Sequence, residues 1–157
     1  MFVCAVLFSS RSICIFIATT LHYFQLVVAF WFNVMSFDVC KAFINLVEQR
    51  SGADKSKKAP QVGATDTKKK TFKIYSCYAW GFPFVVVAAS HVADQLSVLE
   101  DYRPAYAGHV DQPGNHMCWF NNKMGYGMFF ALPVATLMLE NFLLFVTTLV
   151  CMFNKDR

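Results

Sequence analysis

Apolar residues are concentrated in three long stretches of the chain, which polar and charged segments separate. The stretches cover residues 13–46, 72–93 and 125–153. A helix needs about 20 mainly apolar residues to cross roughly 30 Å of hydrocarbon, and each stretch is long enough. The pattern therefore predicts three transmembrane helices. A fourth apolar run, residues 2–8, is too short to span, and we interpret it as the end of a preceding helix or as an interfacial segment.

The composition supports an all-α integral membrane protein. Hydrophobic residues make up 56% of the 157 residues and charged residues only 15%, whereas an average soluble domain carries about 25% charged residues. Disordered chains have few aromatic residues and much charge, so disorder is excluded. The net charge of +4 comes from one short stretch, and this argues against a nucleic-acid partner.

Basic residues are distributed unevenly between the polar segments. Nine Lys and Arg lie between residues 41 and 73, whereas two lie between residues 91 and 125. Lys and Arg are concentrated in the short cytoplasmic loops of membrane proteins. The charge pattern therefore predicts that the first of these segments is cytoplasmic and the second extracellular.

This orientation divides the chain into seven parts. They are an extracellular N-terminal segment (1–12), a first span (13–46), a basic cytoplasmic loop (47–71), a second span (72–93), an extracellular loop (94–124), a third span (125–153) and a cytoplasmic end (154–157). The basic loop is interpreted either as a contact for a partner or for anionic lipid, or as a solvated loop that only sets the orientation.

Polar residues in the first span share one face of the helix. Successive residues are about 100° apart around a helix, and the stripe is centred near His22, opposite a face of apolar residues. Polar groups in hydrocarbon need partners, so this face is predicted to pack against other polar helices or a wet cavity. The stripe contains Thr19, His22, Gln25, Asn33 and Ser36.

The third span carries a carboxyl group near its middle. Glu140 stands next to Asn141, and an ionisable residue at this depth is a candidate functional site. The alternative is a structural carboxyl group that is paired or protonated. Pro83 in the second span and Pro133 in the third each remove one backbone hydrogen bond and are expected to kink their helices.

Motifs for catalysis or metal binding are absent from the sequence. The six Cys form no C-x-x-C pair, and the four His show none of the spacings of zinc sites. Phosphate-binding loops, nucleophile elbows and H-E-x-x-H motifs do not occur. We therefore expect no enzyme activity, no cofactor and no metal, and we interpret His22 as an interior residue with satisfied hydrogen bonds.

Two motifs in the first half of the chain are typical of receptor helices. Residues 14–24, which end in His-Tyr-Phe, are followed by Trp31 at a spacing that resembles the third transmembrane helix of adhesion and secretin-type seven-helix receptors. The second span contains Trp80, Gly81 and Pro83 in a Trp-Gly-x-Pro arrangement. It is similar to the signature of the fourth helix in the same class.

Two further motifs follow in the order that this class requires. Cys118 and Trp119 resemble the Cys-Trp of the second extracellular loop, and Pro133 and Asn141 are spaced as in the fifth helix. Residues 30–38, Phe-Trp-Phe-Asn-Val-Met-Ser-Phe-Asp, narrow the resemblance to the methuselah-like receptors of arthropods. Met35 stands where most secretin-type receptors carry a Glu, and Met there is similar to the methuselah-like pattern.

The resemblance implies a disulfide on the extracellular side. Cys4, Cys14 and Cys118 all fall on that side of the predicted topology, where thiols are oxidised. The pairing of Cys14 with Cys118 is favoured and matches the positions that the family pairs. Cys4 with Cys118 is the nearest alternative.

The resemblance also implies a function. It covers residues 13–153 apart from the basic loop and matches the third to fifth of seven helices, which predicts a partial seven-helix receptor bundle. We expect a fragment of a methuselah-like G protein-coupled receptor, multi-pass in the plasma membrane. Its partners would be the lipid bilayer, other receptor helices and, for an intact receptor, a heterotrimeric G protein. Without the remaining helices it is not expected to signal.

Two other functions remain as alternatives. The chain could be a small structural multi-pass protein whose three helices assemble with a partner. It could also be a transporter fragment in which Glu140 and His22 form a proton or ion site. A transporter would be expected to carry a second intramembrane acid or an inverted repeat, and neither is visible.

Overall fold

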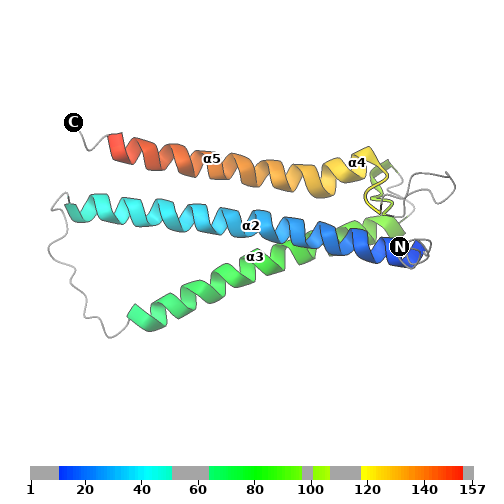
Figure 1. The fold of residues 1–157 in the computed structure, drawn as a ribbon, viewed down its shortest axis with the longest axis horizontal. Helices are drawn as coiled ribbons and strands as arrows, with labels where there is room; N and C mark the ends of the chain where they lie inside the picture. The colour runs from blue at the N-terminus through cyan, green and yellow to red at the C-terminus, as the bar shows by residue number, and fades with distance from the viewer. Residues whose placement is uncertain (1–10, 51–63, 97–100, 107–117, 154–157) are drawn as a thin grey trace, which may run out of the picture. The chain divides into compact units, whose positions relative to one another are not determined.

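The computed structural model describes residues 11–50, 64–96, 101–106 and 118–153. Regular structure within these ranges is helical (Figure 1). The elements are α2 (Arg11–Arg50), α3 (Ala64–Gln95), α4 (Lys123–Tyr126), the π-helical turn η3 (Gly127–Ala131) and α5 (Leu132–Phe153).

Three helical segments among the described residues are long and apolar enough to cross a membrane. They are Ser12–Val47, Lys68–Gln95 and Lys123–Phe153. The last combines α4, η3 and α5. The prediction of an all-α chain with three transmembrane helices is therefore confirmed.

The helices begin and end outside the apolar stretches that predicted them. α2 continues to Arg50, beyond the expected end at residue 46, and α3 begins at Ala64, before the expected start at residue 72. Hydropathy marks only the part of a helix that can lie in hydrocarbon. Lys and Ala are good helix formers, so α3 can begin with polar turns that hydropathy does not detect.

Several predicted segments lie largely outside the described residues. These are the N-terminal segment 1–12, the centre of the basic loop, residues 97–100 and 107–117 of the extracellular loop, and the end 154–157.

The chain divides into two compact units. Unit 1 contains Met1–Val28 and Phe82–Ala135, and unit 2 contains Ala29–Gly81 and Thr136–Arg157. In unit 1, Ala18 and Leu26 of α2 are fully buried, and so are Pro83 and Ser90 of α3. The loop residues Pro104 and Tyr106 are also fully buried, so part of the loop belongs to the core of this unit.

Unit 2 has a core of its own, to which three helices contribute. Phe30 and Val34 of α2, Ala79 of α3 and Leu137 of α5 form one buried cluster. Partly buried hydrophobic residues of α2 and α3 pack against it, namely Ala29, Trp31, Tyr75 and Tyr78.

Large apolar side chains stay exposed along each long helix. Phe16 of α2 is 71% exposed, Phe84 of α3 is 66% exposed and Met138 of α5 is 68% exposed. Exposed apolar surface of this extent is unusual for a soluble monomer. It is what helices present when hydrocarbon surrounds them.

Candidate functional site

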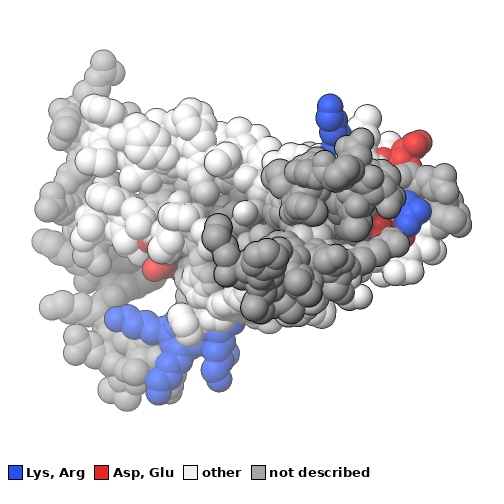
Figure 2. Space-filling model, turned by 45° about the vertical axis from the view of Figure 1, so that its right-hand side comes forward, with Lys and Arg blue, Asp and Glu red and all other residues white. Residues whose placement is uncertain are grey.

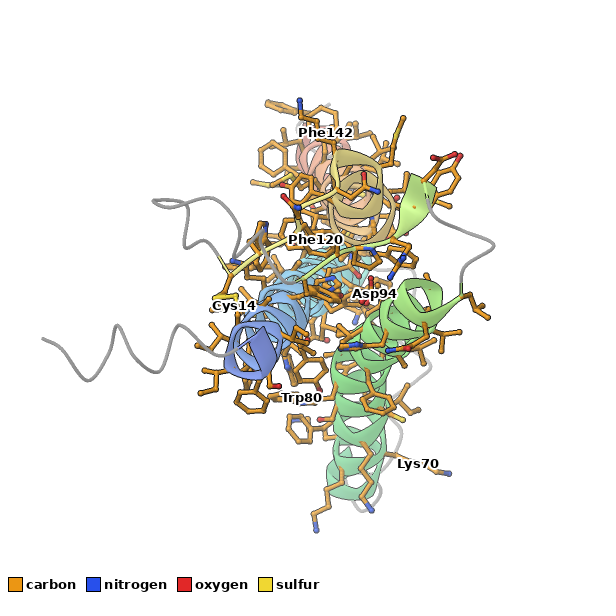
Figure 3. The ribbon with its side chains drawn as sticks, turned by 90° about the vertical axis from the view of Figure 1, so that its right-hand side faces the viewer. Cys14, Lys70, Trp80, Asp94, Phe120 and Phe142 are labelled. Atoms are coloured by element: carbon orange, nitrogen blue, oxygen red, sulfur yellow. A yellow bond between two sulfur atoms is a disulfide. The ribbon has the colours of Figure 1, made fainter. Side chains whose placement is uncertain are left out.

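A disulfide joins the start of α2 to the extracellular loop. Cys14 and Cys118 are bonded, with 4.9 Å between their Cα atoms. Cys14 is buried, and Figure 3 labels it beside α2. The predicted pairing is therefore present, and Cys4 of the alternative pairing lies outside the described residues.

The loop segment 101–106 is held by several contacts from two sides. The carboxylate of Asp94, near the end of α3, accepts the backbone N–H of Ala105 at 3.3 Å and lies 3.7 Å from the Arg103 side chain. The backbone N–H of Asn121 is shared between the carbonyls of Pro104 and Ala105. Ala105 has a φ of 45°, which is unusual for a residue other than glycine, and it turns the chain just before Tyr106.

His22 lies at the centre of unit 1, where it joins the loop to the third span. Its Nδ1 lies 2.9 Å from the hydroxyl of Tyr106, and its Nε2 lies 3.0 Å from the carbonyl oxygen of Phe129. A carbonyl can only accept a hydrogen bond, so Nε2 carries a hydrogen and donates it. The buried side chain is thus fully hydrogen-bonded, as the sequence analysis expects for an interior histidine.

A proline one turn later removes the α-helical partner of the Phe129 carbonyl, which favours its bond to His22. In an α-helix the N–H of residue 133 would bind this carbonyl, but Pro133 has no N–H. The backbone around it forms the π-helical turn η3, a feature often found at functional sites. Pro133 of the third span therefore favours a backbone acceptor, the Phe129 carbonyl, for His22 of α2.

Tyr106 extends the hydrogen-bonded chain to α3. Its side chain is 1% exposed, and its hydroxyl contacts the hydroxyl of Ser90 at 2.5 Å. The Ser90 hydroxyl has one hydrogen, for which the Val87 carbonyl at 2.7 Å and the Tyr106 hydroxyl compete. With a neutral imidazole, Tyr106 donates to Nδ1 of His22 and Nε2 donates to Phe129. This chain connects α3, the loop, α2 and the turn before α5.

Aromatic rings surround the hydrogen-bonded chain. The ring of Phe120 lies 4.9 Å from that of His22 and 5.0 Å from that of Tyr106. Phe130 packs edge-on against His22 at 5.9 Å and against Trp119 at 5.6 Å. Figure 3 labels Phe120 and Asp94 in this region. The loop residues 118–120 thus pack on the same histidine that the loop tyrosine binds.

Thr19 of the predicted stripe has its partner on α3. Its hydroxyl oxygen lies 3.0 Å from Nε2 of His91, and the His91 ring lies 5.2 Å from that of Tyr106. Thr19 and His22, one turn apart on α2, are therefore both connected to Tyr106. His22 contacts it directly, and Thr19 is connected through His91.

Tyr106 should ionise at a higher pH than an ordinary tyrosine. Burial raises the pKa of Tyr106 to about 12, with the hydrogen bond from Ser90 opposing and Asp94 adding to the shift. The folded protein then holds this proton more tightly than the unfolded chain, whose tyrosine has a pKa of about 10. Stability should therefore be unaffected by this group below about pH 10 and should fall from about pH 10 to 12.

Tyrosinate absorbance measures this ionisation. The difference between the titration curves of the parent protein and Tyr106→Phe should have its midpoint near pH 12. A midpoint near the value of an exposed tyrosine would show that water reaches the hydroxyl.

Unit 2 has a separate polar network around Asn33. The Asn33 amide nitrogen donates to Glu140 Oε2 at 3.1 Å and to Asn141 Oδ1 at 3.2 Å. The hydroxyl of Tyr78 donates to the Asn33 side-chain oxygen at 3.3 Å. One buried side chain of α2 thus binds α3 and α5 together, and Glu140, although exposed, has an amide donor.

The remaining predicted residues differ in their surroundings. Gln25 is exposed and Ser36 is half-buried, so the polar stripe is not buried along its whole length. Trp31 packs against Phe72 with ring centres 6.4 Å apart, and Trp80 is 44% exposed. Among the described residues, no group of three or more His, Cys, Asp or Glu side chains could hold a metal ion.

Sequence reasoning missed the residues that the loop contributes. Tyr106 lies in a segment that reads as turns, and nothing in its neighbourhood indicates that it is buried. Ser90 is an isolated hydroxyl in an apolar span. The Phe129 carbonyl could have been found, because it lies four residues before a proline inside a predicted helix.

Comparison with known proteins gives one family. The family model described as "7 transmembrane receptor (Secretin family)" matches residues 4–157. No solved structure matches the chain.

Several receptors of fruit flies are similar to the chain. Probable G-protein coupled receptor Mth-like 2 of Drosophila melanogaster is 25% identical over 87% of the chain and 23% of its own length. Probable G-protein coupled receptor Mth-like 6 of the same species is 27% identical over 88% of the chain and 25% of its own length. G-protein coupled receptor Mth2 of Drosophila simulans is 26% identical over 88% of the chain and 22% of its own length.

The chain thus spans a quarter or less of the length of these relatives. The proteins that it resembles are named as receptors and not as enzymes. The family match extends over almost the whole chain, and the three membrane-spanning helices agree with it. The chain is a multi-pass membrane protein that belongs to the secretin family of seven-transmembrane receptors and is similar to its methuselah-like members.

Proposed function

We propose that the chain supplies the third, fourth and fifth helices of a methuselah-like G protein-coupled receptor and takes part in transmembrane signalling only together with further receptor helices. The observation that carries the proposal is the family match over residues 4–157. The Cys14–Cys118 disulfide, at the positions that the family pairs, supports it. The basic loop would be cytoplasmic, as the charge pattern predicts.

Unit 1 would be the part of the chain that senses events outside the cell. A ligand that moved the extracellular loop would displace Tyr106 from His22 and Ser90. Because His22 also binds Phe129, such a displacement would change the turn that precedes α5. A ligand shifts the population of two arrangements only when it binds one of them more tightly. The hydrogen bonds of Tyr106 and His22 would be present in one arrangement and broken in the other.

A heterotrimeric G protein would bind the cytoplasmic helix ends of an intact receptor. On the proposed orientation these ends include Asp38 and Lys41 of α2, both exposed, and the last turns of α5. Allosteric coupling needs two global states with different contacts at both sites. The helices that would complete such a two-state bundle are outside this chain, so the chain by itself should not activate a G protein.

Cells that carry second-messenger reporters test this proposal. The 157-residue chain expressed alone should give the same reporter output as an empty vector. Co-expression with the other helices of Mth-like 2 as separate chains should raise the output, provided that both parts reach the cell surface. A second-messenger response from the chain alone would contradict the proposal.

A further inference from the structure

Four lysines occupy the first turns of the second span. Lys68, Lys69, Lys70 and Lys73 of α3 are all exposed, and the membrane-spanning segment of this helix begins at the first of them. Figure 3 labels Lys70 at the free end of the helix, and Figure 2 shows basic side chains gathered in one group at its lower left. None of the four makes an ion pair with a carboxylate among the described residues.

Three of these lysines share one face of α3. With 3.6 residues per turn, Lys69 and Lys70 lie within about 100° of each other and on either side of Lys73. The opposite face carries Tyr75, whose hydroxyl donates to Asp38 of α2 at 3.3 Å, and the ring of Phe37 packs against it. The face with the three lysines is therefore the one that points away from α2. We call it the lysine face.

Lys68 does not belong to the lysine face. It lies seven residues before Tyr75, which places the two within about 20° of each other around the helix. It has the same charge, the same exposure and almost the same depth as its neighbours. Lys68 is therefore an internal control, because it carries the same charge as the other three lysines but lies on a different face of α3.

The lysine face changes from charged to apolar one turn further along the helix. Ile74 follows Lys70 by four residues and is 65% exposed. Cys77 follows Lys73 by the same interval and is also exposed. Residues four apart on a helix are neighbours on its surface. A molecule on this face would thus meet ammonium groups first and apolar side chains next to them.

Lipids have the same order of polarity, with an anionic headgroup above acyl chains. Lys and Arg clusters directly cytoplasmic of a transmembrane helix are typical of sites for anionic lipids. The Cα atoms of the three lysines are spread over only about 6 Å along the helix axis, at a rise of 1.5 Å per residue. A headgroup with one charge can pair with only one ammonium group, whereas a ring that carries several phosphate groups can pair with all three.

We propose that Lys69, Lys70 and Lys73 form a binding site for the headgroup of a lipid that carries several phosphates, with Ile74 and Cys77 beside its acyl chains. The ligand class is the phosphatidylinositol phosphates. The proposal rests on the cytoplasmic placement of this end of α3 that is part of the proposed function.

Lipid retention in nanodiscs tests the proposal. The chain is reconstituted in phosphatidylcholine with either phosphatidylserine or phosphatidylinositol bisphosphate, at equal total headgroup charge, and bound lipids are counted by native mass spectrometry. The bisphosphate lipid should be retained several-fold more than phosphatidylserine. Each lysine near a membrane surface contributes about fivefold in affinity, so K69Q/K70Q/K73Q should weaken binding on the order of a hundredfold.

Single-charge variants separate the lysine face from general attraction. Lys70→Gln should lower the affinity for the bisphosphate lipid about fivefold and reduce its preference over phosphatidylserine, whereas Lys68→Gln removes only general surface charge and should leave that preference unchanged. An equal loss of lipid preference from both variants, or equal retention of the two anionic lipids by the parent chain, would contradict a discrete site. So would a triple variant that keeps the lipid but no longer binds an acidic peptide, because the face would then serve a protein.

The orientation is tested separately. Cysteine-labelling tags at Gly63 and Gly108 should react from opposite sides of the membrane in intact cells. If Gly63 reacts from outside, the proposed topology is wrong, although nanodisc binding could still succeed. If the orientation holds and the nanodisc preference is absent, the lipid site alone fails.

Discussion

Removing the disulfide should destabilise unit 1 by about 2–4 kcal/mol. The bond joins residues 104 positions apart, and closing a loop of about 100 residues is worth roughly 4.7 kcal/mol in the chain-entropy model. Transmembrane helices remain formed when a membrane protein unfolds within a bilayer or micelle, so the denatured chain has less freedom to lose. We therefore expect the lower value for C14S/C118S.

Denaturation of detergent-solubilised protein by increasing SDS measures the effect. Both cysteines are replaced together, because a free Cys118 could pair with Cys4. Cys77→Ser is the matched control, since this cysteine is free and exposed. Equal midpoints for the double variant and the control would show that the bond does not contribute to folding.

The transmembrane spans could be predicted because hydropathy is a property of local sequence. Each apolar stretch had to cross hydrocarbon, so its length alone indicated a helix. The ends of the helices could not be predicted in this way. Helical turns such as those at Lys68 and Lys69 carry exposed polar side chains, and their stability depends on helix propensity instead of hydropathy.

Helical periodicity placed Thr19 and His22 together, but it did not reveal their partners. Tyr106 lies 84 residues from His22 in sequence, and no local pattern indicates that a loop tyrosine enters the core. Gln25 shares the stripe and yet is exposed. A helical wheel treats every turn alike, whereas burial depends on which neighbour lies beside each turn.

The disulfide was predicted from the topology and from the resemblance, not from periodicity. Charge asymmetry placed Cys14 and Cys118 on one side of the membrane, and Cys4 was left as an alternative partner. Two residues of the network around Asn33 could be predicted separately. Asn33 belongs to the polar stripe, and Glu140 is a carboxyl group near the middle of its span. Their contact at 3.1 Å joins two residues that lie 107 positions apart in sequence.

Gly125→Ala should displace the loop segment 101–106 and destabilise unit 1 by about 1–3 kcal/mol, the usual cost of overpacking. Gly125 is buried in α4. A Cβ atom at this position would lie 2.6 Å from the carbonyl oxygen of Arg103 and 2.8 Å from Cα of Pro104. These are backbone atoms, so a side-chain rotation cannot relieve the clash.

The segment has little freedom to retreat because its neighbours are fixed. Pro104 is fully buried, and its carbonyl accepts from the backbone of Asn121. A shift that made room for the methyl group would also move Tyr106, two residues later, away from His22 and Ser90. Loss of the bond between Tyr106 and Nδ1 of His22 would leave a buried polar atom unsatisfied, which costs more than the bond itself contributes.

Gly127→Ala is a matched control two residues further along the same helical segment. No atom lies within 4 Å of a Cβ at Gly127, and its φ of −57° is helical. Alanine there should stabilise the helix by up to about 1 kcal/mol, because glycine loses more backbone entropy on folding. The two variants should therefore shift the SDS midpoint in opposite directions. If both shift it alike, the segment 101–106 does not pack on α4, and Tyr106 would have to reach His22 without that support.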